Sequence, residues 1–238
     1  MISEAAESAL PRGPVFFDAL ERHFAVAVRG LLPAAEASAW ARAVLAARAE
    51  WNADFGGEQW SLGRAFYTHL ETERAREYFR EAAASDAIVE RVLPGMQARV
   101  RDLLATFVAG RVVPRPGWCG PGVHVFLPEG EVAEHGGVVH QDHEGLTRAQ
   151  LSRGARALSL VLMLAPPQSG GGLRLFAAKS EEEADEEESV VVEYGQGDLV
   201  VFDSYRVHQI EPFAGDAPRV SVTLHSVEVS EGVWESWF

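Results

Sequence analysis

The chain has 238 residues, of which 47% are hydrophobic and 24% are charged, and its formal net charge is −14. This composition suits one large globular domain or two small ones with an ample core. Proteins that bind nucleic acid normally carry a basic footprint, so the acidic balance argues against DNA or RNA as a substrate. No stretch reaches the roughly 18 apolar residues of a membrane span, and we expect no membrane association.

Cysteine usage and the first residues indicate the cytoplasm. Cys119 is the only cysteine, so no intrachain disulfide can form, which fits a reducing compartment. We expect Cys119 to be an inert, small apolar residue. Residues 1–7 have neither the basic region nor the apolar region of a secretory signal. The sequence does not indicate an oligomeric state.

The first half of the chain predicts helices that follow one early strand. Residues 22–29 resemble a strand, and residues 33–50 a helix with proline in its first turn. Residues 74–83 predict a second helix, and another begins near Ser85, an N-cap candidate, and is broken by Pro94. Apolar residues at helical spacing mark two buried stripes: Trp40, Val44 and Ala47, and Met96, Val100, Leu103 and Phe107.

The second half changes to short β-like runs separated by glycine-rich turns. The expected strands are residues 123–127, 138–142, 157–164, 173–176, 190–193, 199–202, 207–212 and 220–229. The pattern predicts an α+β fold, a double-stranded β-helix (jelly roll) of about eight strands backed by N-terminal helices. We treat residues 1–238 as one domain, with a mainly helical support region at 1–116 and the jelly-roll core at 117–238. The acidic run at 181–188 is expected to be a solvated loop.

Two histidines and an aspartate are the most informative residues. His140 and Asp142 are two apart, so on a strand they point to the same side, and His208 follows 66 residues after Asp142. This is the composition of the 2-His-1-carboxylate triad, which binds ferrous iron and leaves coordination positions open. A His-x-Asp pattern alone is weak, but residues 197–202 upstream of His208 and Arg219 downstream strengthen it.

Arg219 and Ser221 share one strand face just beyond the metal candidates. Arginine can form two parallel hydrogen bonds to a carboxylate, and it stays charged at any relevant pH. If Arg219 faces into the barrel, it needs an anionic partner, because burying an unpaired charge is prohibitive. The alternative is a surface salt bridge at a strand start. Thr223 shares the face, and we interpret it as a β-former only.

These motifs together resemble the Fe(II)/2-oxoglutarate-dependent oxygenase superfamily. The resemblance rests on His140-Gln141-Asp142, on residues 197–208 and on Arg219-Val220-Ser221, and it covers roughly residues 120–230. It implies His140, Asp142 and His208 as iron ligands, and Arg219 with Ser221 as the anchor of the distal carboxylate of 2-oxoglutarate. It also implies Fe(II), 2-oxoglutarate and O2 as cofactors, with release of succinate and CO2.

Two details refine this resemblance. The halogenase branch of the superfamily lacks the carboxylate ligand, so Asp142 argues for hydroxylation or a related oxidation. Residues 117–124 resemble an uncharacterised bacterial branch, which implies no particular substrate. His124 lies on the first expected barrel strand, from which members of this fold reach the metal or co-substrate. We interpret His124 as a cofactor-binding candidate, with a packing role as the alternative.

The substrate candidates come from an irregular aromatic segment and two loops. Trp60, Arg64 and Tyr67, together with Trp118, would form an aromatic wall with one arginine, suited to a small carboxylate-bearing substrate. Ordinary core and rim packing is the alternative. Glu144, just past the metal strand, is a candidate for holding a substrate amine. His135 and His143 are interpreted as polar loop residues.

The leading hypothesis is an oxygenase that hydroxylates a C–H bond of a small metabolite, amino acid-like or part of a natural product. Three alternatives remain open: a cupin-like metalloenzyme that does not use 2-oxoglutarate, a peptide or protein hydroxylase, and a non-catalytic jelly-roll binding protein. The fold alone does not separate them, because function lies in the site.

Overall fold

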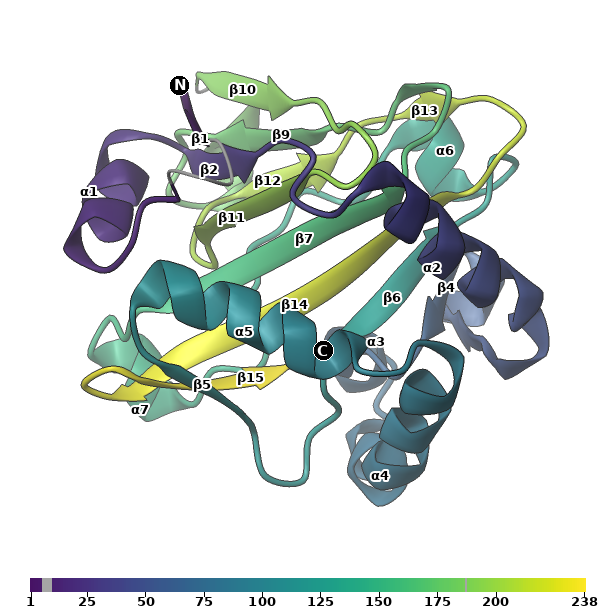
Figure 1. Ribbon diagram of the computed structural model, residues 1–238. Coiled ribbons are helices and arrows are strands. Elements are labelled where there is room, and N and C mark those ends of the chain that lie inside the picture. The colour runs from purple at the N-terminus through teal and green to yellow at the C-terminus, as the bar shows by residue number, and fades with distance from the viewer. Residues whose placement is uncertain (6–9, 187) are drawn as a thin grey trace.

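The computed structural model describes residues 1–5, 10–186 and 188–238, and in them a large sheet dominates (Figure 1). Ten of the described strands belong to it. Its order is β1 (Ile2–Ala5), β2 (Ala25–Val28), β11 (Leu199–Asp203), β7 (Ala157–Ala165), β14 (Arg219–Ser230), β6 (Gly122–Phe126), β4 (Gln59–Leu62) and β3 (Asn52–Asp54). The long strand β14 also pairs with β15 (Val233–Trp237), which pairs with β5 (Arg111–Pro114).

A smaller antiparallel sheet faces part of the large one. It consists of β10 (Ser189–Val192), β9 (Leu173–Phe176) and β12 (His208–Ile210), and a short pair joins β8 (Ser169–Gly170) to β13 (Phe213–Ala214). Buried side chains from both sheets, including Leu175 and Phe202, form a shared core. The expected α+β fold with two facing sheets is confirmed, and strands from the first half of the chain take part in it.

The described helices lie outside both sheets, and several of them pack against the other face of the large sheet. They are α1 (Pro14–Arg22), α2 (Ala34–Ala46), α3 (Phe66–Glu71), α4 (Ala75–Val92), α5 (Met96–Val108), α6 (Glu131–His135) and α7 (Arg148–Ser152). Helix α5 lies across β7 and β14 (Figure 1), and its Val100, Leu104 and Phe107 are buried in the main core. Within the described ranges, no helix has both the length and the apolar character needed to cross a bilayer.

Successive side chains of strand β14 point alternately into the core and toward the candidate site. Side chains of a strand point alternately to opposite faces. Val220, Val222 and Leu224 therefore join the core beneath the helices, and the intervening residues turn to the opposite face. The residues on that face line a cavity: Arg219, Ser221, Thr223 and His225. Neighbouring β6 is in register, with Ser221 opposite His124.

Three local expectations were wrong, each for an identifiable reason. The two helices expected on either side of Ser85 are one helix, α4, because Ser85 is buried mid-helix and caps nothing. Residues 138–142 form no strand but a single bridge between His140 and His208, since only that pair exchanges ladder hydrogen bonds. The segment at 52–68, expected to be irregular, contains the β3–β4 hairpin and the start of α3. Strand pairing forms this hairpin although the sequence pattern for strands is weak there.

The Gly-Asp pair before β11 has a structural role. Asp198 Oδ1 accepts a hydrogen bond from Gly30 N at 2.7 Å, and Asp198 Oδ2 accepts from Gly195 N and from Arg29 Nη1. Gly197 has a φ of 82°, a region that favours glycine, and its N–H bonds to Met163 O. These contacts fasten the turn before β11 to the loop after β2.

The acidic run lies between β9 and β10. Residues Glu181–Glu186 form a 3₁₀ helix, and the side chains at 181–183 are exposed. Position 187 of the expected solvated loop lies outside the described residues.

Candidate active site

His140, Asp142 and His208 meet in space as a candidate metal centre. His140 Nε2 lies 3.5 Å from Asp142 Oδ1, and His208 Nε2 lies 3.5 Å from Asp142 Oδ2. One ligand atom from each residue lies within 4.8 Å of the others. Bonds of about 2.1 Å from a metal ion to adjacent ligands at right angles separate the ligand atoms by ~3 Å, so small side-chain movements suffice to enclose an ion. Imidazole and carboxylate together form a donor set that Fe(II) accepts.

Backbone hydrogen bonds fix this cluster and its tautomers. His140 and His208 exchange backbone hydrogen bonds, and Asp142 N donates to Ser204 O. His140 Nδ1 lies 2.9 Å from Val138 O, and His208 Nδ1 lies 2.9 Å from Arg206 O. A carbonyl can only accept, so each Nδ1 carries a proton, and Nε2 is the nitrogen of each ring that is available as a metal ligand.

The electrostatics of the cluster favour a bound cation. Burial by itself raises the pKa of Asp142, but the neighbouring His208 and His225 imidazoles hold it well below its ordinary value. Burial also lowers the pKa of His208 to about 4, so this ring is neutral at physiological pH. His140 differs, because although burial lowers its pKa, the hydrogen bond to Asp142 raises it to about 9, so metal binding at this ring displaces a proton.

Arg219 lies in the same cavity and is nearly fully buried. Its side chain donates from Nε to Gly171 O at 3.0 Å and from Nη1 to Ser221 Oγ at 3.2 Å. Burial lowers its pKa to about 10, which still leaves it charged at neutral pH. In the described part of the chain, no carboxylate lies within ion-pair distance of this guanidinium. A buried cation of this kind calls for an anionic ligand.

Two further histidines lie beside the triad. His225, which sequence reasoning missed, follows Arg219, Ser221 and Thr223 on the same face of β14, so its even spacing from Arg219 was the available signal. Its Nδ1 lies 3.1 Å from Ser159 Oγ. His124, from β6, also lines the cavity, and burial lowers its pKa to about 3.

The cavity around these groups has a volume of about 420 Å³. Small-molecule sites typically measure some 300–1,000 Å³, so a co-substrate and a small substrate can share it. Its inner end is formed by buried residues of β6, β12 and β14. Its mouth is formed by the β3–β4 hairpin, α3 and α6, which contribute the exposed lining residues Glu58, Glu71, Glu131 and His135. Of the expected substrate residues, Tyr67 and Glu144 line the cavity.

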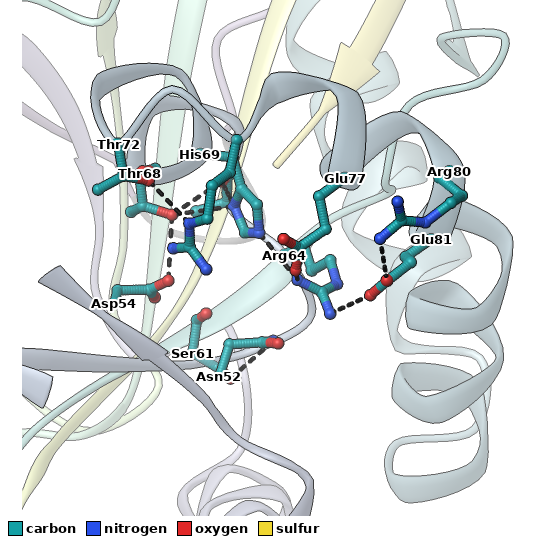
Figure 2. Close-up of polar contacts among 12 residues, drawn as sticks. Asn52, Asp54, Ser61, Arg64, Thr68, His69, Thr72, Glu77, Arg80 and Glu81 are labelled. Carbon is teal, nitrogen blue, oxygen red and sulfur yellow. Dashed lines mark hydrogen bonds and ion pairs between the residues drawn. The ribbon is translucent and has the colours of Figure 1, made fainter. Parts of the chain in front are cut away.

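Trp60, Arg64 and Trp118 are not among the residues that line the cavity. Trp60 packs against the main core, and Trp118 packs in a second core cluster that includes Phe66. Arg64 points toward Glu77 and Glu81 of helix α4 (Figure 2), and it forms ion pairs with both. The arginine expected to receive a substrate carboxylate is therefore already paired.

The contacts in Figure 2 also connect two parts of the cavity wall. Thr68 Oγ1 donates to Asp54 Oδ1 at 3.0 Å, which joins α3 to the β3–β4 hairpin. Phe55 follows Asp54 and Tyr67 precedes Thr68, and both aromatic residues line the cavity. Asp54 is fully buried, its Oδ2 has no hydrogen-bond partner, and burial raises its pKa to about 6.

Comparison with known families agrees with this geometry. Residues 128–226 match the family described as the 2OG-Fe(II) oxygenase superfamily, a stretch that includes the triad and Arg219. Over these residues the chain matches the pattern of this oxygenase superfamily, as expected from the sequence. Its cofactors are accordingly Fe(II) and 2-oxoglutarate, as expected from the sequence, and the cluster of His140, Asp142 and His208 is a possible iron site. No curated protein matches the sequence of this oxygenase.

Solved structures share the fold of the oxygenase at low sequence identity. An N-substituted L-amino acid dioxygenase from Burkholderia ambifaria AMMD is 15% identical with a TM-score of 0.57, and the match covers 94% of this chain and 90% of that one. The epimerase SnoN from nogalamycin biosynthesis is 18% identical with a TM-score of 0.54, covering 86% and 78%. The carbocyclase SnoK of the same biosynthesis is 15% identical with a TM-score of 0.54, covering 87% and 81%.

Proposed function

We propose that this oxygenase hydroxylates a C–H bond of a small metabolite and converts 2-oxoglutarate and O2 to succinate and CO2. In this proposal His140, Asp142 and His208 hold Fe(II), and Arg219 with Ser221 binds the distal carboxylate of 2-oxoglutarate. One oxygen atom of O2 enters succinate and the other enters the substrate. The lone, buried Cys119 also fits the reducing cytoplasm, which we propose as the compartment.

The observation that carries the proposal is a buried guanidinium in the cavity of the triad. Arg219 is 2% exposed and has no ion-pair partner in the described residues. A metalloenzyme that did not use an anionic co-substrate would gain nothing from this burial, which costs free energy without a partner. The carboxylate of a keto-acid satisfies the charge and can be held by Ser221 Oγ as well.

The residues of the chain each have a defined task in this reaction. Bound Fe(II) supplies the activation of O2. The Nε2 atoms of His140 and His208 and the Asp142 carboxylate supply three ligands on one side, and β12 holds His208 in place by its bridge to His140. Arg219 orients 2-oxoglutarate from the closed end of the cavity, so the open end is left for the substrate.

The test is an anaerobic titration of the protein with Fe(II) and 2-oxoglutarate. We expect a weak visible charge-transfer band that saturates with 2-oxoglutarate, and succinate formation once air is admitted. His208→Ala should lose both signals. His143→Ala is the matched control, because His143 is near the triad in sequence but does not line the cavity, and it should keep both.

Two outcomes would count against the proposal. If no band formed at saturating 2-oxoglutarate, the use of this co-substrate would be contradicted. If His208→Ala still formed succinate, the assignment of the triad as iron ligands would be contradicted. Mass analysis of the oxidised substrate then separates hydroxylation, which adds one oxygen atom, from other oxidations.

A further inference from the structure

The outer half of the cavity, toward its mouth, carries negative charge. Besides Asp142 of the triad, four carboxylates line the cavity: Glu58, Glu71, Glu131 and Glu144. No lysine lines it, and its one arginine, Arg219, lies at the buried end. His135 is the remaining basic candidate at the mouth, and its Nε2 lies 3.7 Å from Glu131 Oε2 and 3.8 Å from Glu134 Oε1.

The inner half balances its own charges once the proposed cofactors are bound. A divalent ion with one Asp142 carboxylate leaves one positive charge, and a 2-oxoglutarate dianion on Arg219 leaves one negative charge. These cancel, so the glutamates of the outer half add a net negative potential where the substrate enters. Walls of low dielectric concentrate such a potential and attract ligands of opposite charge.

These glutamates are not neutralised by neighbours. In the described residues, Glu58, Glu71 and Glu144 form no ion pair, whereas Glu77 and Glu81 on nearby α4 pair with Arg64. Glu144 is also partly buried. A partly desolvated carboxylate gains more from a cationic partner than an exposed one does.

The cavity offers more than acidic groups to a ligand. Phe55 and Tyr67 lie with ring centroids 6.1 Å apart and line the same mouth, and Gln59 Nε2 donates to the Tyr67 hydroxyl at 2.6 Å. Such rings bind an apolar body and attract a cation to their faces. Independently, His124 is 7% exposed and lines the cavity, and its Nδ1 has no hydrogen-bond partner among the described residues. A buried polar atom without a partner requires an explanation, and a bound ligand is one.

We propose that the substrate is a small protonated amine with an apolar body, whose ammonium group is held by Glu144 and the glutamates of the mouth. The proposal rests on the proposed oxygenase function. An anionic substrate finds no free cation in the outer half, because Arg64 is paired with Glu77 and Glu81. A substrate carboxylate would instead meet like charges.

The test measures binding without turnover. The protein is loaded with Fe(II) and 2-oxoglutarate without oxygen, and its visible band is followed while probes are added. The probes are primary and secondary alkyl and arylalkyl amines, each with the alcohol and the carboxylate of the same carbon skeleton. We expect amines to perturb the band with at least tenfold higher affinity than their alcohols, and the carboxylates to bind most weakly.

Variants identify the group responsible. Glu144→Gln should remove about tenfold of the affinity for amines and leave that for the matched alcohols unchanged. Glu134→Gln is the control, because Glu134 belongs to α6 but does not line the cavity, and it should retain the preference. Equal or tighter binding of carboxylates, no binding by any amine, or an unchanged preference in Glu144→Gln would overturn the inference. Because the band forms before any probe is added, its absence would instead reject the proposed function.

Discussion

Asp142 Oδ2 lies 3.6 Å from Nδ1 of His225, on the strand that also carries Arg219. Ser159 Oγ lies within hydrogen-bond distance of the same nitrogen and of Ser204 Oγ, while Ser204 O accepts the backbone N–H of Asp142. One polar network therefore meets Asp142 at two places, with His225 facing its carboxylate and Ser204 accepting its backbone N–H. Partners of this kind orient metal ligands and tune their basicity.

His225 should therefore control metal affinity without being a ligand. We expect His225→Ala to weaken Fe(II) binding roughly 10–100-fold, the usual effect of removing such a partner. His225→Asn, which keeps a polar group near Asp142, should restore part of it. Competition with a chelating indicator measures both. Unchanged metal affinity in His225→Ala would show that the contact is incidental.

Replacing Arg219 should raise the stability of the protein and abolish its binding of 2-oxoglutarate. Burying a charge costs free energy, and replacing even a paired buried charge cluster by apolar side chains can stabilise a protein by about 1–4 kcal/mol. Arg219→Met should therefore unfold at a higher temperature than the parent when 2-oxoglutarate is absent. It should also lose the thermal stabilisation by 2-oxoglutarate, while its metal affinity stays the same. A variant that is less stable and still binds the keto-acid would contradict the anchor.

Replacing Gly197 should destabilise the protein through its backbone. A Cβ atom at this position would lie 1.9 Å from Leu32 O, and the φ of 82° strains any other residue. Gly197→Ala should lower the free energy of unfolding by more than about 2 kcal/mol, because the turn before β11 must shift. Gly154→Ala is the control, since Gly154 also has a positive φ but open space around it, and should cost roughly 1 kcal/mol. Denaturant titrations compare the two, and equal effects would reject the clash.

Asp54 predicts a pH dependence of stability. Its pKa in the folded protein is about 6, above the ordinary value of 3.8. Between these values the folded state keeps a proton that the unfolded state releases, so the free energy of unfolding falls as pH rises, by up to about 3 kcal/mol in all. Asp54→Asn lacks this group. The stability of the parent relative to Asp54→Asn should thus decrease from pH 4 to pH 7, and a flat difference would disprove the shift.

Most strands of the jelly roll could be predicted from the sequence, because short runs rich in β-branched residues alternate with glycine-rich turns. The pattern at 173–176 matches β9, and the run at 157–164 falls within β7. The sequence could nominate His140, Asp142 and His208 as metal ligands because their residue types and spacing carry chemical information, and the structure brings them together although residues 138–142 form only a bridge. That bridge depends on tertiary pairing, which no local pattern encodes.

The substrate side could not be predicted in the same way. Arg64 was expected at the substrate, yet whether an arginine faces a cavity or a glutamate depends on how helices pack. Here the glutamates of α4, Glu77 and Glu81, lie within its reach. Conversely, Glu58 and Glu71 belong to no recognisable sequence motif. Only the folding of the β3–β4 hairpin and α3 brings them to the mouth of the cavity.

The division of the cavity between elements has a consequence for how the protein can diversify. Its inner end is formed by paired strands, and the register of the 12-residue strand β14 with β6 and β7 is fixed by the core on its opposite face, so changes there are coupled to folding. Its mouth is formed by a short hairpin and two helices of at most six residues. Heritable variation in these short elements can select a new substrate while the machinery beneath is inherited unchanged.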